Sequence, residues 1–178
     1  MSKTDDVGVR LAEAADRDKI WPLARAFATT YELDQGRYNA SFQQLVAEPN
    51  ALLIIAHTPV TDIVGYLLAF THQTFLANGP VTWIEEVMVA EEVRRRGIGH
   101  NLMVAAENWS ASKGAAYVAL ATRRASDFYL ALGYTESAAY FRKLVRAREQ
   151  TRPGASSHRP PGPVEVDTAT RANPQLHS

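Results

Sequence analysis

The chain of 178 residues contains no cysteine. Disulfides, thiolate metal sites and a covalent cysteine-acyl intermediate are therefore excluded, so any acyl transfer would be direct. The chain also lacks a net charge, because 19 lysine and arginine residues balance 19 aspartate and glutamate residues. A neutral chain has no net field that attracts a polyanion, and we expect no nucleic-acid partner.

Long hydrophobic runs are also absent, although 46% of the residues are hydrophobic. No run approaches the roughly 20 apolar residues that a membrane span needs, and residues 1–10 lack the hydrophobic region of a signal peptide. We expect a soluble cytoplasmic protein without a membrane partner. The five histidines show no metal-ligand spacing, and neither a nucleophile elbow nor a phosphate loop occurs. We therefore expect no metal site.

The pattern of apolar residues predicts one domain over residues 1–146, followed by a disordered tail of proline, serine and other polar residues over 147–178. Alternation and short apolar runs predict strands, and spacings of three and four predict helices. The expected strands are 7–12, 51–56, 63–70, 81–89, 117–121 (buried) and 140–145, and the expected helices are 15–31, a segment that includes Phe42, Leu45 and Val46, 97–114 and 126–132. Antiparallel pairing of successive strands is the simplest arrangement for 51–89.

A basic turn connects the strand 81–89 to the helix that follows. Three arginines, Arg94, Arg95 and Arg96, precede Gly97, and Gly99 follows one residue later. The first N–H groups of a helix have no intrahelical partner and attract anions, and glycines let the backbone approach a pyrophosphate closely. The segment is therefore either an anion cradle or a surface loop with solvated arginines.

The spacing Arg-x-x-Gly-x-Gly from Arg94 to Gly99 resembles the acetyl-CoA motif of the GNAT acetyltransferases. Downstream, the run Phe-Tyr-Leu-Ala-Leu-Gly-Tyr over 128–134 resembles the family's short helix and its glycine-aromatic end, and 137–143 resembles the closing strand. The resemblance covers residues 83–145. It implies an α/β (α+β) fold of the GNAT-like acyl-CoA N-acyltransferase type, with a central, mixed, mostly antiparallel, V-shaped sheet flanked by helices.

The resemblance also implies a place for acetyl-CoA. The strand backbone would pair with the pantetheine arm, and the N–H groups of the turn and the first helical residues would hold the pyrophosphate. These residues are Val87, Met88, Val89, Arg94, Arg95, Arg96, Gly97, Ile98, Gly99 and His100. An asparagine that many members use near the later helix is replaced by the segment 122–126, which contains none.

Three residues are candidates for acid and base catalysis. Glu85 and Glu86 lie in an otherwise apolar strand, where successive side chains point to opposite faces, so at least one should border a cleft. Similar family members place the base in this pair; we favour Glu85, and the alternative is a solvent-facing position. The resemblance implies that Tyr129 protonates the leaving thiolate, whereas a buried core tyrosine is the alternative.

Taken together, these features predict a transferase, an N-acetyltransferase that moves the acetyl group of acetyl-CoA directly to a primary amine in a ternary complex. A small molecule is the expected acceptor. A protein acetyltransferase that acts on an Nα-terminus or a lysine, and a non-catalytic acyl-CoA-binding sensor, are the alternatives. The sequence leaves homodimerisation open.

Overall fold

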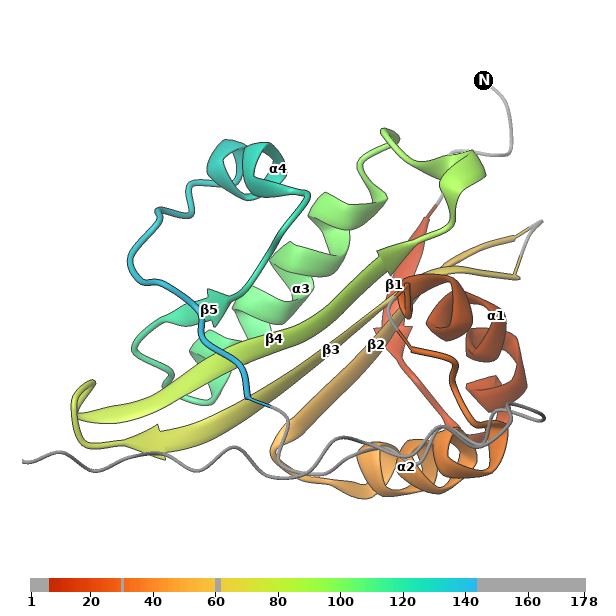
Figure 1. The fold of residues 1–178 in the computed structure, drawn as a ribbon, viewed down its shortest axis with the longest axis horizontal. Coiled ribbons are helices and arrows are strands. Elements are labelled where there is room, and N and C mark those ends of the chain that lie inside the picture. Colours follow the sequence, from red (N-terminus) through yellow and green to blue (C-terminus); the bar gives the residue numbers. More distant parts are fainter. Residues whose placement is uncertain (1–6, 30, 60–61, 144–178) are drawn as a thin grey trace, which may run out of the picture. The chain divides into compact units, whose positions relative to one another are not determined.

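A five-stranded sheet is the centre of the fold (Figure 1). The computed structural model describes residues 7–29, 31–59 and 62–143. The chain divides into two compact units, Met1–Tyr140 and Phe141–Ser178, and all elements below belong to the first. The predicted tail, 147–178, lies outside the described residues. No helix of the described part is long and apolar enough to cross a membrane.

The strands lie in the sheet in chain order, and their bounds are β1 (Gly8–Leu11), β2 (Ala51–Thr58), β3 (Asp62–Thr74), β4 (Gly79–Val89) and β5 (Val118–Leu120). The first four pair antiparallel with their neighbours, which confirms the pairing predicted for the strands of 51–89, and β5 runs parallel to β4. β5 pairs with β4 only at residues 82–84. From residue 85 onward β4 continues without β5, so the sheet opens here as the V shape requires.

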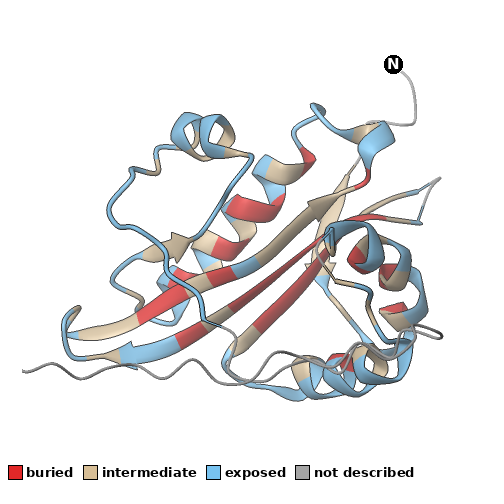
Figure 2. Ribbon diagram, in the orientation of Figure 1, coloured by how far each residue is buried: buried red, intermediate tan, exposed pale blue. Residues whose placement is uncertain are grey.

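Helices cover both faces of the sheet (Figure 1). One face, called the α3 face, packs its apolar side chains against Leu102, Met103 and Ala106 of α3 (Ile98–Ser112), which are fully buried. Figure 2 shows buried residues concentrated along the central strands and on the inner side of this helix. The helix predicted over 97–114 is thus confirmed. A short helix, α4 (Ser126–Ala131), follows β5, as predicted.

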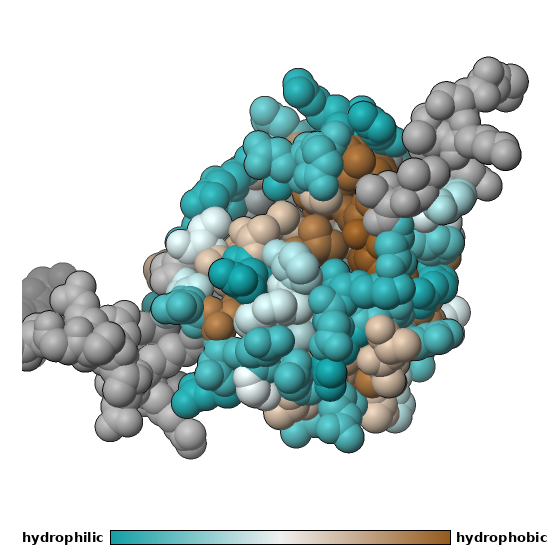
Figure 3. Space-filling view, turned by 90° about the vertical axis from the view of Figure 1, so that its right-hand side faces the viewer, coloured by the Kyte–Doolittle hydropathy of each residue, from teal (hydrophilic) through white to brown (hydrophobic). Residues whose placement is uncertain are grey.

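The opposite face, called the α1–α2 face, is covered by α1 (Arg17–Phe27) and α2 (Gln35–Ala47). Its core joins Ile20, Ala24 and Phe42 to side chains of β2 and β3. A short 3-10 turn, Ala14–Asp16, precedes α1, and the helix ends at Phe27 rather than at residue 31. Thr29, a β-branched residue of low helix propensity, is already in a tight turn. The side of the molecule that lies at the right in Figure 1 has a mostly hydrophilic surface, with its main hydrophobic area in the upper part of the view (Figure 3).

β4 contains a β-bulge in its centre. Leu68 of β3 pairs with Glu86, but the next residue, Ala69, pairs with Ile84, so Glu85 is an additional residue on β4. The bulge shifts the alternation of side chains by one residue. Ile84 and Val87 therefore both belong to the α3 face although they are three positions apart in the sequence. The strand was predicted correctly, whereas the bulge has no marker in the sequence.

Two expectations for the C-terminal part are wrong. The strand near 117–121 was expected to be buried, but Val118–Leu120 are only partly buried and Tyr117 is 49% exposed. β5 pairs with β4 alone, so its other edge has no strand neighbour in the described part of the chain. The strand expected at 140–145 is absent from 140–143, and 144–145 lie outside the described residues. The ring of Tyr140 instead stacks on Trp83, with 6.2 Å between centroids.

Candidate active site

The predicted cradle lies between β4 and α3. A 3-10 turn, Glu91–Val93, follows β4, and the chain then passes through Arg94, Arg95 and Arg96 into α3. The N–H of Asn101 donates to the carbonyl of Gly97 at 3.0 Å, as the first bond of the helix. The N–H groups of Ile98, Gly99 and His100 precede it and have no acceptor within the helix. They form the positive end of a helix of 15 residues.

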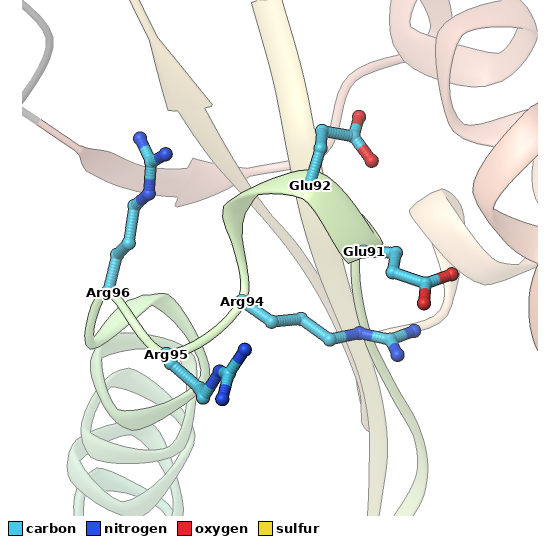
Figure 4. Close-up of a pocket in the computed structure, with 5 residues that line it drawn as sticks. All are labelled: Glu91, Glu92, Arg94, Arg95 and Arg96. Atoms are coloured by element: carbon cyan, nitrogen blue, oxygen red, sulfur yellow. The ribbon is translucent and has the colours of Figure 1, made fainter.

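Charged side chains surround this turn and line a pocket of about 410 Å³, formed by Glu91, Glu92, Arg94, Arg95 and Arg96. Figure 4 shows Arg94 and Arg95 extending to one side of the turn and Arg96 from the opposite side. Arg94 is held in place because its Nε donates to the carbonyl oxygen of Val89 at 3.0 Å. Arg95 has a φ of +62°, a left-handed conformation that few non-glycine residues adopt.

The two glycines of the motif have different structural roles. Gly97 has a φ of +79°, and no atom lies within 4 Å of the position that a Cβ would take. Its conformation, which glycine adopts without a steric penalty, is therefore what the position needs. Gly99 lies in the helix, and a Cβ there would be 3.2 Å from the ring of Phe128 on α4. Gly99 thus allows α4 to pack closely against the start of α3.

The free edge of β4 presents alternate backbone groups. The N–H of Ala90 donates to Val64 of β3 at 2.9 Å, so Ala90, Met88 and Glu86 direct their N–H and C=O groups toward β3. Val87 and Val89 consequently direct theirs toward the opening beside β5. The C=O of Val89 already accepts the bond from Arg94. The backbone groups of Val87 and the N–H of Val89 remain for a ligand in the opening, whereas those of Met88 belong to the ladder with β3.

The two glutamates are separated by the bulge. Glu85 is the additional residue of the bulge, and its side chain is exposed. Glu86 is partly buried on the α1–α2 face, where its Oε2 accepts a hydrogen bond from the hydroxyl of Tyr66 at 2.6 Å. Burial raises the pKa of Glu86, and the Tyr66 bond opposes this rise because it stabilises the charged form.

Tyr129 lies on the other side of the sheet and packs against the α3-face core. Its ring makes edge contacts with Phe128 and Tyr134, at centroid distances of 4.9 and 5.9 Å. Burial raises its pKa, so the phenol is neutral at physiological pH. Tyr134 donates to Glu107 of α3 at 2.9 Å, and its backbone N–H donates to the carbonyl of Tyr129 at 3.0 Å. These contacts hold the end of α4 against α3.

The structure brings the cradle and the free edge of β4 together in one continuous stretch, 87–100. Glu86 and Tyr129 lie on opposite faces of the sheet. The sequence does not indicate the partners of Tyr66 and Tyr134, because strand register and packing determine them. The segment 122–126 forms a turn in which Thr122 Oγ1 accepts from the N–H of Ala125 at 3.1 Å. Within the described residues, no group of three or more metal-ligating side chains occurs.

Comparison with known proteins identifies a family that matches this chain. The model of the acetyltransferase (GNAT) family matches residues 17–134. No protein of curated function matches the chain.

Solved structures show the same fold. Glucosamine-6-phosphate N-acetyltransferase of Arabidopsis thaliana superposes with a TM-score of 0.70 at 18% identity, covering 79% of this chain and 99% of its own. A Trypanosoma brucei acetyltransferase superposes with a TM-score of 0.68 at 24% identity, and the match covers 79% of this chain and 100% of that protein. An aminoglycoside acetyltransferase from an uncultured soil metagenomic sample, in complex with sisomicin, superposes with a TM-score of 0.63 at 20% identity. This match covers 79% of this chain and 97% of that protein. The predicted fold is confirmed, and the chain belongs to the GNAT acetyltransferase family.

Proposed function

We propose that the protein transfers the acetyl group of acetyl-CoA directly to a primary amine of a small molecule, in a ternary complex. The observation that carries this proposal is the continuous stretch from the free edge of β4 to the N-terminus of α3. It offers backbone donors and acceptors to an extended amide-containing chain, and N–H groups with three arginines to a pyrophosphate. Acetyl-CoA has these two parts in this order.

In this proposal, acetyl-CoA would use backbone groups that the ladder between β3 and β4 leaves free. Val87 and Val89 would pair with the pantetheine amides, since the groups of Met88 are directed to β3. The N–H groups from Arg95 to His100 would hold the pyrophosphate. Arg95 and Arg96 would add positive charge, and Arg94 would contribute its terminal nitrogens, because its Nε is bound to Val89. An N–H of Val87 or Val89 is also available to the oxyanion of the tetrahedral intermediate.

A base is needed because the acceptor amine is protonated in water. For an amine with a pKa of about 10.4, neutralisation at pH 7 costs roughly 4.6 kcal/mol. Glu86 is the residue that we now favour for this role, in place of Glu85, since it is partly buried and has a raised pKa beside the opening of the sheet. Exposed Glu85 would attract a cationic acceptor but lacks the environment of a base.

In the reaction, Glu86 first passes one proton of the ammonium group to solvent. The neutral amine nitrogen then forms a bond to the thioester carbonyl, and its second proton passes to Glu86, which returns it to solvent. Collapse of the tetrahedral intermediate breaks the carbon–sulfur bond, and the thiolate of CoA leaves. Tyr129 would donate a hydrogen bond and then a proton to this sulfur. A phenol with a pKa near 10 is a weaker acid than a thiol near 8.5, so full transfer in water costs about 2 kcal/mol. Tyr129 would therefore assist late in the step, and solvent would return its proton.

A small amine is the acceptor we propose, and the relatives of known activity support it. One acetylates glucosamine-6-phosphate and another is an aminoglycoside acetyltransferase, so this fold accommodates amino sugars. Their identity to this chain is low, and the proposal therefore extends to the class of small primary amines and not to a particular sugar. A protein lysine or Nα-terminus stays the alternative acceptor.

Titration calorimetry with acetyl-CoA tests the cradle. We expect micromolar binding to the wild type and at least a tenfold weaker affinity for Gly97→Val, which corresponds to about 1.4 kcal/mol. Gly114→Val is a matched control, since Gly114 lies at the opposite end of α3 with a φ of +72° and also has no atom within 4 Å of a Cβ. Both variants should lose similar stability, but only Gly97→Val should lose acetyl-CoA.

A panel of small amines, scored by the release of free CoA thiol, then identifies the acceptor class. Peptides with a free N-terminus or a lysine are included as the competing class. Absence of acetyl-CoA binding to the wild type would contradict the proposal, and binding without turnover on any amine would favour the non-catalytic sensor.

A further inference from the structure

Tyr66 and Glu86 form a buried polar pair between two neighbouring strands. Tyr66 is 2% exposed and lies on β3, on the α1–α2 face. Glu86 pairs across the ladder with Leu68, so Tyr66 is two residues further along β3 on the same face and is a diagonal neighbour of Glu86. A long side chain covers this separation, and the hydroxyl reaches Oε2 at 2.6 Å. Such a short O–H···O⁻ contact is typical of a charge-assisted hydrogen bond.

No cation accompanies this carboxylate in the described part of the chain. The ion pairs found there are Arg10–Asp16, Arg17–Asp18 and Lys19–Asp62. The titratable groups that face Glu86 are Tyr66 on β3, Glu85 on the same strand and Tyr38 on α2. Glu85 disfavours the charged form of Glu86, and burial disfavours it more strongly. The hydroxyl of Tyr66 is therefore the group that opposes the loss of charge.

We propose that Tyr66 is the positioning residue for Glu86: its hydroxyl holds Oε2, stabilises the carboxylate and leaves Oε1 to accept the proton of the acceptor amine. The inference rests on the proposed function, in which Glu86 is the base. It assigns a separate role to each carboxylate oxygen. A carboxylate without this bond would rotate freely about its terminal torsion, and it would be protonated over more of the pH range.

A tyrosine is well suited to this role because it remains a donor. Burial raises the pKa of Tyr66, and the adjacent negative charge of Glu86 raises it further. The phenol therefore keeps its proton throughout the range in which the enzyme would work. It donates to Glu86 without competing for the proton of the amine. A histidine at this position would titrate near neutral pH and would change the charge of the pair.

The competing explanation is that Tyr66 only fills the core. Tyr66→Phe separates the two, since it keeps the ring and removes the hydroxyl. A filling role predicts at most a loss of stability, with the titration of Glu86 unchanged. A positioning role predicts that the pKa of Glu86 rises, because the charged form loses its hydrogen bond.

The experiment is a carbon-13 NMR titration of the glutamate side-chain carboxyls in the unliganded protein, with Glu86→Gln to assign the signal. We expect the midpoint of Glu86 to move toward higher pH by about one unit in Tyr66→Phe, since hydrogen bonds to charged groups contribute about 1.5–3 kcal/mol. Tyr134→Phe is the matched control. It removes a tyrosine–glutamate bond of 2.9 Å, to Glu107, and should leave the midpoint of Glu86 in place.

The pH profile of kcat/KM for the amine then links the titration to the reaction. The acidic limb of the profile should move with the NMR midpoint in Tyr66→Phe. An unchanged midpoint in an active enzyme would overturn the role of Tyr66 alone. A shifted midpoint in a protein that transfers no acetyl group to any amine would overturn the proposed function, and the control of Glu86 by Tyr66 would remain established.

Discussion

The two faces of the sheet hold their candidate catalytic groups in different ways. On the α3 face, Tyr129 is fixed by ring contacts with Phe128 and Tyr134, and its side chain makes no hydrogen bond among the described residues. On the α1–α2 face, Glu86 is fixed by a hydrogen bond from Tyr66. The difference follows from charge. A neutral phenol is positioned by packing alone, whereas a partly buried carboxylate needs a donor to remain ionised.

The largest expected effect on activity concerns Glu86 on the α1–α2 face. Glu86→Gln should lower kcat/KM by about 10²-fold to 10⁴-fold, the range that a positioned base contributes. The amide keeps the shape of the side chain and can still accept from Tyr66. Glu85→Gln is the matched control on the adjacent, exposed residue. It should change kcat/KM by no more than about threefold, since exposed charges interact weakly in water.

Steady-state measurement of CoA release, with acetyl-CoA saturating and the amine varied, distinguishes the two variants. If Glu85→Gln is instead the inactive variant, Glu85 is the base and the assignment of this role to Glu86 is wrong. Calorimetry with acetyl-CoA should give unchanged affinities for both, because neither side chain belongs to the cradle.

This pair of glutamates also shows where the sequence was informative. Strand β4 and its place between a hairpin and a basic turn follow from the apolar pattern of 81–89 and from the motif that begins at Arg94. The choice between the glutamates does not follow, because one extra residue in the ladder changes which face each side chain occupies. The bulge depends on pairing with β3, which is a property of two strands and is not visible in either one.

A similar limit applies to the C-terminal segment. The residues 140–143 were expected to form a strand from their own sequence, but a strand also depends on pairing with another strand, which the sequence of one segment does not determine. The structure shows no strand there, and Tyr140 packs on Trp83. By contrast, α3 and α4 were predicted well, since their apolar stripes, Gly97 and Gly133 are local signals.

A smaller effect on activity is expected for Tyr129 on the α3 face. Tyr129→Phe should lower kcat about tenfold, since the phenol assists the departure of the thiolate by hydrogen bonding and is a weak acid. Burial raises its pKa, which further favours hydrogen bonding over early proton transfer. The ring contacts remain in the variant, so the affinity for acetyl-CoA should not change. Tyr117→Phe, on an exposed tyrosine, is the control.

Rapid-quench measurement of a single turnover separates the chemical step from product release. A tenfold slower single turnover would support the role of Tyr129 as proton donor. If the single-turnover rate is unchanged, the hydroxyl of Tyr129 does not act on the sulfur, and the α3 face contributes no proton donor to the reaction.

The smallest effect is on stability, and it sharpens the contrast between the faces. Burial raises the pKa of Glu86 above its ordinary value of 4.5, so the folded state binds this proton more tightly than the unfolded state. Stability contributed by this group is therefore present below about pH 4.5 and decreases as the pH rises through the folded-state pKa.

Glu86→Gln removes this dependence, so the variant should unfold at a higher temperature than the wild type at pH 8 and at a similar temperature near pH 4. In a domain of this size, each 1 kcal/mol of stabilisation raises Tm by roughly 2–4 °C. Tyr129→Phe should show no such pH dependence between pH 4 and 8, because Tyr129 stays neutral over this range. Thermal unfolding of both variants and the wild type at four pH values provides the measurement. An equal Tm difference for Glu86→Gln at every pH would mean that packing, and not the buried charge, distinguishes the α1–α2 face.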